Sequence, residues 1–258
     1  MINVNSLLTT TFFVCTIYLC SSFSMDGSRV ISYPDENTIE DSTNLGLSAD
    51  DVIEKYLQAI GGRKQIESIV DRTTTMSGTT MGKTLSIVVQ QKTPSMLRQE
   101  INAGPVKQTI IFDGKKGVMI MGEQKSVLGD NELNKLKLEA QMNFLLNPEL
   151  FGVQVELIGM EIIDSVQCYD ISLNMEDSTN WNQYYEVKSG LKIKEIKGVK
   201  TPQGIFDQES LYDDYRDVGE LKYPFKIKQS LGVQTIELNI EMIEINTGLK
   251  DALFEIPE

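Results

Sequence analysis

The first pattern along the chain predicts a helix that begins at Ser48 and ends near Ile60. Ser48 and Asp51 stand three residues apart, as in a capping box, where side chains bond to free N–H groups of the first turn. Gly61 and Gly62 then end the helix, because glycine readily adopts the left-handed conformation that follows many helices. The apolar residues recur at helical spacing and form one stripe: Val52, Ile53, Tyr56, Leu57 and Ile60.

The same glycines raise the alternative of a phosphate-binding loop. Such a loop follows a strand, has a longer glycine-rich stretch and places Ser or Thr after its Lys. Here a helix precedes the glycines, and Gln65 follows Lys64. We therefore interpret Gly61 and Gly62 as the boundary between the first helix and a further short helical segment, Arg63 to Ile69.

From Asp71 on, apolar and polar residues alternate, which is typical of strands with one buried face. About five such stretches precede a second helical patch, and about six follow it. Asp130 is the candidate N-cap of that patch, which ends before Pro148. Its apolar residues are Leu133, Leu136, Leu138, Met142, Phe144 and Leu145. The clearest strand lies near the C-terminus, and its predicted inward residues are Ile236, Leu238, Ile240 and Met242.

These elements predict an α+β fold that is mainly antiparallel β. Short turns join the strands without a long βαβ crossover, which disfavours a parallel sheet. A meander of about 11 strands must curl, and its apolar concave face needs a cover. We therefore expect a curled, unclosed half-barrel with the two helical patches as a lid on the concave face.

The start of the chain is an uncharged, mostly apolar run, Leu7 to Phe23, followed by Ser24. Its length is typical of the apolar core of a secretory signal sequence and is short for a spanning helix. We expect a signal peptide at residues 1–24 and hence export. An uncleaved anchor and a start at Met25 are the alternatives.

After the signal peptide we expect a disordered polar leader at residues 25–47 and one binding domain at 48–258. Cys20 offers a further alternative, a lipid-anchored N-terminus, but the bulky Leu19 before it is unlike the small residue that lipidation sequences prefer.

Composition narrows the possible functions. The net charge of −13 argues against nucleic acid and anionic membrane surfaces as partners, because both are bound by lysine and arginine. The chain contains no histidine, the usual general base and commonest metal ligand. We therefore expect a non-catalytic protein without cofactor or metal; an enzyme that uses two carboxylates is the alternative.

Three short patterns invite a chemical interpretation that their context does not support. Ser189 and Lys192 match SxxK, but they lie in a predicted hairpin and not at a helix start. The stretch Asp213 to Asp217 lacks the spaced oxygens and central glycine of a calcium loop. Cys168 stands alone after the signal run, so it has no disulfide partner in the domain, and no base pattern accompanies it.

Four stretches of the chain resemble the LolA-type family of periplasmic lipoprotein carriers, in the broad form of outer membrane lipoprotein-sorting proteins. They are the first helix ADDVIEKYLQAIGG, the strand entrance KTPSMLR at Lys92 to Arg98, the hairpin TIIFDGKKGVMIM at Thr109 to Met121, and the closing DALFEIP at Asp251 to Pro257. Together they extend over nearly the whole expected domain.

The resemblance implies an unclosed β-barrel with a helical lid, whose apolar cavity shields acyl chains in transit through the periplasm without catalysis. It implies the periplasm as the destination of the exported chain, with lipid or lipoprotein acyl chains and envelope transport proteins as partners, and we expect a monomer. The family's carriers place an arginine directly before the strand proline, where it bonds to the lid backbone. Here that residue is Thr93, which puts this way of locking the lid in question.

We expect the ligand to contact apolar residues on the inner faces of the strands and lid. These are Ile87, Val89, Met96, Ile111, Met119, Met121, Leu136, Met142, Phe144 and Leu145. Met119 and Met121 are equally plausible as ordinary core residues. The alternative function is a protein-interaction or scaffold module of the same fold, with a filled core and no lipid cargo.

Overall fold

The computed structural model describes most of the expected domain. The described residues are 40–41, 46–80, 82–175, 180–201 and 204–258. The expected signal peptide and most of the expected leader lie outside them. Among the described helices, none is long and apolar enough to cross a bilayer.

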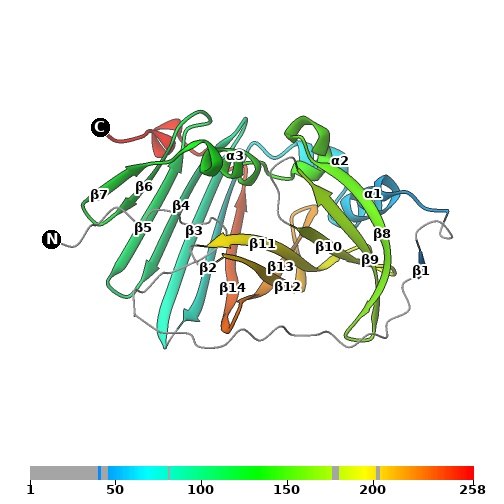
Figure 1. Cartoon of the computed structure of the whole chain (residues 1–258). Coiled ribbons are helices and arrows are strands. Elements are labelled where there is room, and N and C mark those ends of the chain that lie inside the picture. Colours follow the sequence, from blue (N-terminus) through cyan, green and yellow to red (C-terminus); the bar gives the residue numbers. More distant parts are fainter. Residues whose placement is uncertain (1–39, 42–45, 81, 176–179, 202–203) are drawn as a thin grey trace.

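The described residues form one antiparallel sheet of fourteen strands, with the helices gathered along one side of it (Figure 1). The helices are α1 (Ala49–Ala59), α2 (Arg63–Glu67) and α3 (Asp130–Glu139), and the short 3₁₀ helices are η2 (Phe144–Leu146), η3 (Pro148–Phe151) and η4 (Asp251–Phe254). The strands before α3 are β1 (Glu40–Asp41), β2 (Asp71–Thr80), β3 (Lys83–Lys92), β4 (Met96–Ala103), β5 (Val106–Phe112), β6 (Gly117–Met121) and β7 (Gln124–Val127). Those after it are β8 (Gln154–Ile163), β9 (Val166–Asn174), β10 (Trp181–Glu186), β11 (Lys192–Thr201), β12 (Gly204–Val218), β13 (Leu221–Leu231) and β14 (Gln234–Ile245).

The sheet consists of two meanders, β2 to β7 and β8 to β14, which pairing of β14 with β2 joins into one surface. In the described part of the chain the outer strands β1 and β7 do not pair with each other, so the curled sheet stays open. This confirms the expected antiparallel, unclosed half-barrel.

The strands outnumber the expected eleven or so, and two of them, β1 and β7, lack the sequence pattern that predicts a strand. β1 has two residues, and β7 has four that are mostly exposed. Both are held by backbone hydrogen bonds to a neighbouring strand, β8 and β6 respectively, which need no apolar side chain.

Helix α1 begins as its sequence predicts. The Ser48 side chain accepts a hydrogen bond from the Asp51 amide at 3.2 Å, and the Ser48 amide donates to the Asp51 carboxylate at 2.8 Å. At the other end the amide of Gly62 donates to the carbonyl of Leu57 at 2.8 Å. Gly61 has φ of +127°, and a Cβ there would lie 2.5 Å from the Glu220 carbonyl oxygen. The glycine pair therefore ends a helix where the chain passes close to another strand.

The second helical patch differs from its prediction at both ends. Gly129, in an extended conformation, is the N-cap of α3, and Asp130 is the first helical residue. The helix ends at Glu139, and the rest of the patch forms η2, in which the Asn143 side chain accepts from the Leu145 amide. The patch therefore bends, and its two halves pack against different parts of the sheet.

Strand β14 also departs from simple alternation. Ile236, Leu238 and Ile240 are buried as predicted, but Met242 is 45% exposed. The pairing of β14 with β2 shifts register between Ile240 and Met242, which is the mark of a β-bulge. The extra residue reverses the sides, so that Ile243 and not Met242 faces inwards.

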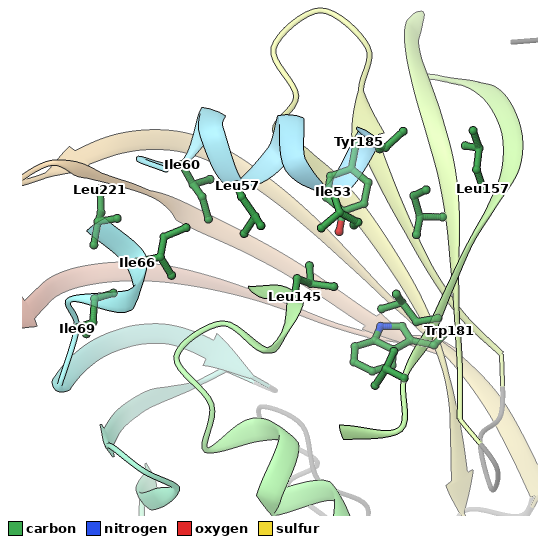
Figure 2. Close-up of a cluster of buried hydrophobic side chains, with 14 residues drawn as sticks. Ile53, Leu57, Ile60, Ile66, Ile69, Leu145, Leu157, Trp181, Tyr185 and Leu221 are labelled. Atoms are coloured by element: carbon green, nitrogen blue, oxygen red, sulfur yellow. The ribbon is translucent and has the colours of Figure 1, made fainter. Parts of the chain in front are cut away.

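The structure contains three clusters of buried apolar residues, two that pack the lid onto the sheet and one within the sheet. The first packs α1, α2 and η2 onto the β8 to β10 strands, with Leu57 and Tyr185 fully buried (Figure 2). The second lies on β2, β3, β4 and β14. The third packs α3 onto β4, β5 and β6 around Phe112 and Leu136. The lid is therefore anchored at two separate places.

Candidate functional site

A cavity of about 340 Å³ lies between the sheet and the lid. Its walls come from β2, β3, β4 and β10 to β14 on the sheet side, and from α1, α2, the end of α3 and η2 on the lid side. Most of the lining surface is apolar. The volume is near the lower end of the range of about 300–1,000 Å³ typical of small-molecule sites.

Four of the ten residues that the sequence suggests for ligand contact line this cavity: Val89, Met142, Phe144 and Leu145. Three others, Ile87, Met119 and Leu136, are packed inside the second and third apolar clusters. Ligand contact by any of the ten stays a prediction.

The remaining three lie elsewhere because of strand parity or position. Met96 precedes Leu97, and it is Leu97 that lines the cavity. Ile111 lies between Ile110 and Phe112, which point into the third cluster, so its side chain leaves the opposite face of β5. Met121 is 43% exposed at the end of β6.

A buried ion pair lies in the cavity wall, where we expected only apolar residues. The Lys192 ammonium is 2.9 Å from the Glu195 carboxylate. Gln183 donates to the same carboxylate at 2.7 Å and accepts from the hydroxyl of Tyr185. Burial raises the pKa of Glu195, but the charges of Lys192 and Lys197 and the hydrogen bonds outweigh it and leave this pKa below its usual value. The pair therefore stays charged inside the protein.

The SxxK match is resolved by the same geometry. Ser189 lies in the turn between β10 and β11, as predicted, and its hydroxyl donates to Glu186. Lys192 is the functional candidate of the two, but its partner is Glu195 and not the serine.

The lid is held to the sheet by Gln91 of β3. Its side-chain amide donates to the carbonyl of Glu139 at 2.6 Å and to that of Gln141 at 3.2 Å. Its oxygen accepts from the Arg72 guanidinium at 3.0 Å. The contact between strand and lid backbone that Thr93 was expected to lose is therefore supplied by a glutamine two residues earlier.

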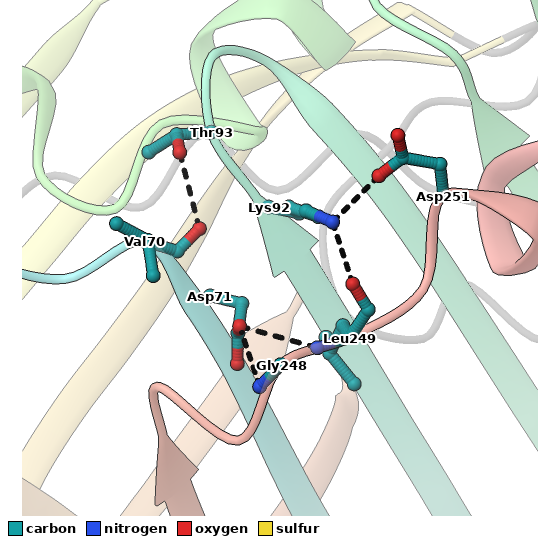
Figure 3. A network of polar contacts seen from close by, with 7 residues as sticks. All are labelled: Val70, Asp71, Lys92, Thr93, Gly248, Leu249 and Asp251. Atoms are coloured by element: carbon teal, nitrogen blue, oxygen red, sulfur yellow. Dashed lines mark hydrogen bonds and ion pairs between the residues drawn. The ribbon is translucent and has the colours of Figure 1, made fainter.

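Thr93 and its neighbour Lys92 instead fasten other segments to the end of β3 (Figure 3). The Thr93 hydroxyl donates to the carbonyl of Val70 at 3.2 Å. The Lys92 ammonium donates to the Leu249 carbonyl at 2.6 Å and pairs with Asp251. Two of the stretches that carry the family resemblance thus meet in space, although 159 positions separate Lys92 from Asp251.

Next to them a buried carboxylate organises the chain after β14 (Figure 3). Asp71 accepts hydrogen bonds from the amides of Thr247, Gly248 and Leu249 at 2.8, 2.9 and 3.2 Å. These contacts lead the C-terminal segment across the strand ends to η4.

A second group with polar residues lies where the end of α3 and η2 face β10 and β11. The Lys197 ammonium lies 4.2 Å from the centre of the Trp181 ring, and the Phe144 ring packs on Trp181 at 5.3 Å between centres. Burial raises the pKa of Glu139 to about 8, against the lowering by Lys197 and Lys135. Glu139 and Trp181 both line the cavity.

The other sequence candidates show no reactive arrangement. Cys168 is fully buried, and burial raises the pKa of its thiol to about 11, which disfavours the reactive thiolate. Within the stretch Asp213 to Asp217, Arg216 pairs with Asp214 at 2.6 Å on the surface. In the part of the chain that the structure describes, no group of three or more acidic or cysteine side chains could hold a metal ion.

The sequence matches no family model, and no curated protein matches it. Solved structures do match over most of its length. A LolA superfamily protein from Nitrosomonas europaea has a TM-score of 0.57 at 14% identity, covering 82% of this chain and 99% of that one. A DUF1329 family protein from Desulfovibrio piger has a TM-score of 0.53 at 11% identity, covering 80% and 97%.

A third match is a domain from Vibrio parahaemolyticus named for outer membrane lipoprotein sorting, with a TM-score of 0.52 at 10% identity, covering 80% of this chain and 97% of that one. Such low identities compare folds and not functions. The open antiparallel sheet, its helical lid and these matches together show that the chain has the LolA-type fold.

Proposed function

We propose that this protein is a non-catalytic binding or carrier protein that takes an acyl chain of a lipoprotein, or of a related lipid-like ligand, into the cavity beneath its lid. The observation that carries the proposal is the mostly apolar space of about 340 Å³ between sheet and helices. Each methylene that moves from water into such a space contributes about 0.8 kcal/mol. A short length of acyl chain is therefore enough for useful affinity.

The lid must move for a chain to enter, and its anchoring favours one route. The first apolar cluster buries residues of α1 and α2 completely, whereas Met142 and Phe144 of the segment from Glu139 to Phe144 are only partly buried against it. This segment lines the cavity, and the Gln91 hydrogen bonds hold its backbone to the sheet. A few hydrogen bonds from an uncharged amide contribute less stabilising free energy than a packed apolar cluster. Ligand entry therefore proceeds by release of this segment.

The proposed location is the periplasm, with transport proteins of the cell envelope as partners. The apolar run at Leu7 to Phe23 supports export, and the fold shared with a domain named for outer membrane lipoprotein sorting supports the envelope. A periplasmic carrier needs neither a nucleic-acid partner nor a cofactor.

The proposal is tested by placing a larger side chain at a cavity-lining position. Val89→Phe adds bulk to a lining residue of β3, and Val88→Phe adds the same bulk on the opposite face of the same strand. Native mass spectrometry of the purified chain should detect bound acyl species in the parent and in Val88→Phe, and at least about tenfold less in Val89→Phe. Absence of acyl species from all three, with a folded parent, would leave the scaffold alternative.

A further inference from the structure

Two polar atoms in the cavity wall lack a hydrogen-bond partner in the part of the chain that the structure describes. They are the indole Nε1 of Trp181 and the carboxyl Oε1 of Glu139, both shielded from water. The Trp181 side chain is only 4% exposed, and in Figure 2 its nitrogen points into the interior. Buried polar groups in proteins nearly always have a hydrogen-bond partner. Two polar atoms without one, beside an open space, therefore indicate that a ligand group binds there.

Both atoms belong to one small cluster, formed by Glu139, Phe144, Trp181 and Lys197. Trp181 and Lys197 are directly paired across β10 and β11, and the ammonium lies over the indole ring. Lys197 and Glu139 are close enough to shift each other's pKa. Phe144 covers the indole from the lid.

The cluster presents donors and positive charge. An indole nitrogen can only donate, and a lysine ammonium can only donate. Glu139, whose pKa burial raises to about 8, keeps its proton at neutral pH and donates as well. In a chain with a net charge of −13, this local excess of positive charge is unusual. It fits an anionic acceptor.

We propose, building on the function above, that the cavity binds a single acyl chain with a free carboxylate, and that the carboxylate bonds to Trp181, Glu139 and Lys197 when Phe144 shifts with the lid. The chain lies in the apolar part of the cavity beside Val89 and Leu97. A volume near the lower end of the small-molecule range accommodates one chain and not a multi-chain lipid.

The chain reports on this site by itself, because Trp181 is its only tryptophan. Dodecanoate, methyl dodecanoate and dodecyltrimethylammonium share one alkyl chain and differ in head group. In titrations below micelle-forming concentrations, dodecanoate should bind and change the Trp181 emission. The uncharged ester should bind about tenfold more weakly, because charge-assisted hydrogen bonds are the stronger kind, and the cation should leave the emission unchanged.

Two variants separate recognition from folding. Trp181→Phe keeps an aromatic ring and removes the donor, and calorimetry should show about tenfold weaker dodecanoate binding. Lys197→Met should weaken dodecanoate binding similarly and leave the ester unaffected. Lys194→Met is the matched control, because Lys194 pairs with Glu209 and its ammonium lies over the Tyr184 ring and not over the Trp181 ring.

The pH dependence provides an independent readout. As the pH rises through about 8, Glu139 loses its proton and repels a carboxylate, so dodecanoate affinity should fall. The charged groups that act on Glu139 are Lys197 and Lys135, and Lys192 and Glu195 act in turn on Lys197. Glu139→Gln keeps a neutral donor and should abolish this fall in affinity. A fall caused by titration of a lysine would persist in this variant.

The outcomes distinguish this inference from the function on which it rests. Equal affinities for dodecanoate and its methyl ester, unchanged in Trp181→Phe and Lys197→Met, overturn carboxylate recognition and leave acyl-chain binding intact. Failure of every alkyl probe to bind a folded parent chain overturns both.

Discussion

The interior of this protein has two regions that differ although one sheet builds both. Between α1 and the strands β9 and β10 the space is filled by interlocking apolar side chains such as Leu57, Ile171 and Tyr185, all with no exposed surface. Beneath the end of α3 the same sheet carries Arg72, Lys192 and Glu195 around an open cavity. The comparison indicates a division of labour, in which the packed region holds the lid and the hollow region is available for a ligand.

The two regions differ because different interactions stabilise them. A packed apolar cluster gains from burial and close contact everywhere, so it has one best arrangement. A cavity wall with charged groups gains less and depends on a few hydrogen bonds, so a small change in those bonds can open it.

The largest effect should come from breaking the ion pair in the cavity wall. Lys192→Met leaves Glu195 buried without its main counter-charge, which we expect to lower the free energy of unfolding by about 3–5 kcal/mol. Urea denaturation at neutral pH measures it. The double variant Lys192→Met/Glu195→Leu removes both charges and should recover most of the loss. A double variant as unstable as the single one would show that the loss comes from altered packing and not from an unpaired charge.

A slightly smaller effect should follow from a cut in the packed region. Leu57→Ala removes a side chain with no exposed surface and should cost about 2–5 kcal/mol of unfolding free energy. Met142→Ala on the cavity wall should cost less, because its neighbours already border open space. Equal losses in the same denaturation experiment would mean that the two regions are packed alike.

The smallest effect on global stability should come from the lid contact, where the effect is local. Gln91→Leu removes the hydrogen bonds to the Glu139 and Gln141 carbonyls and should cost about 1–2 kcal/mol. Hydrogen exchange of the lid from Glu139 to Leu145 should become faster, while α1 keeps its protection. Gln90→Leu, on the other face of β3, is the control; uniform acceleration in α1 and the lid would contradict separate anchoring.

The local elements could be predicted because their signals are local. The Ser48 and Asp51 cap, the glycines after Ile60 and the alternation up to Ile240 each depend on a few adjacent residues. The antiparallel, unclosed sheet follows from many such strands joined by short turns. The sequence pattern did not predict β7 or the bulge after Ile240, because backbone pairing and register depend little on side-chain type.

The candidate site was predictable only in part. Val89, Met142, Phe144 and Leu145 line the cavity, but Met96 and Ile111 miss it by the parity of a single residue. The ion pair of Lys192 and Glu195 was not foreseen, because charged residues are usually exposed and no pattern marks the few that are buried together.

By itself the sequence determined the kind of sheet, the helix boundaries near Ser48 and Gly61 and the absence of histidine chemistry, because each depends on residue type or short-range spacing. Only the tertiary structure decided that Gln91 holds the lid and that Lys92 meets Asp251. It also decided that Glu139 and Trp181 border a cavity, and that Glu139 Oε1 and Trp181 Nε1 have no hydrogen-bond partner among the described residues. Such contacts join positions far apart in the chain, and their energies depend on burial that only the completed fold creates.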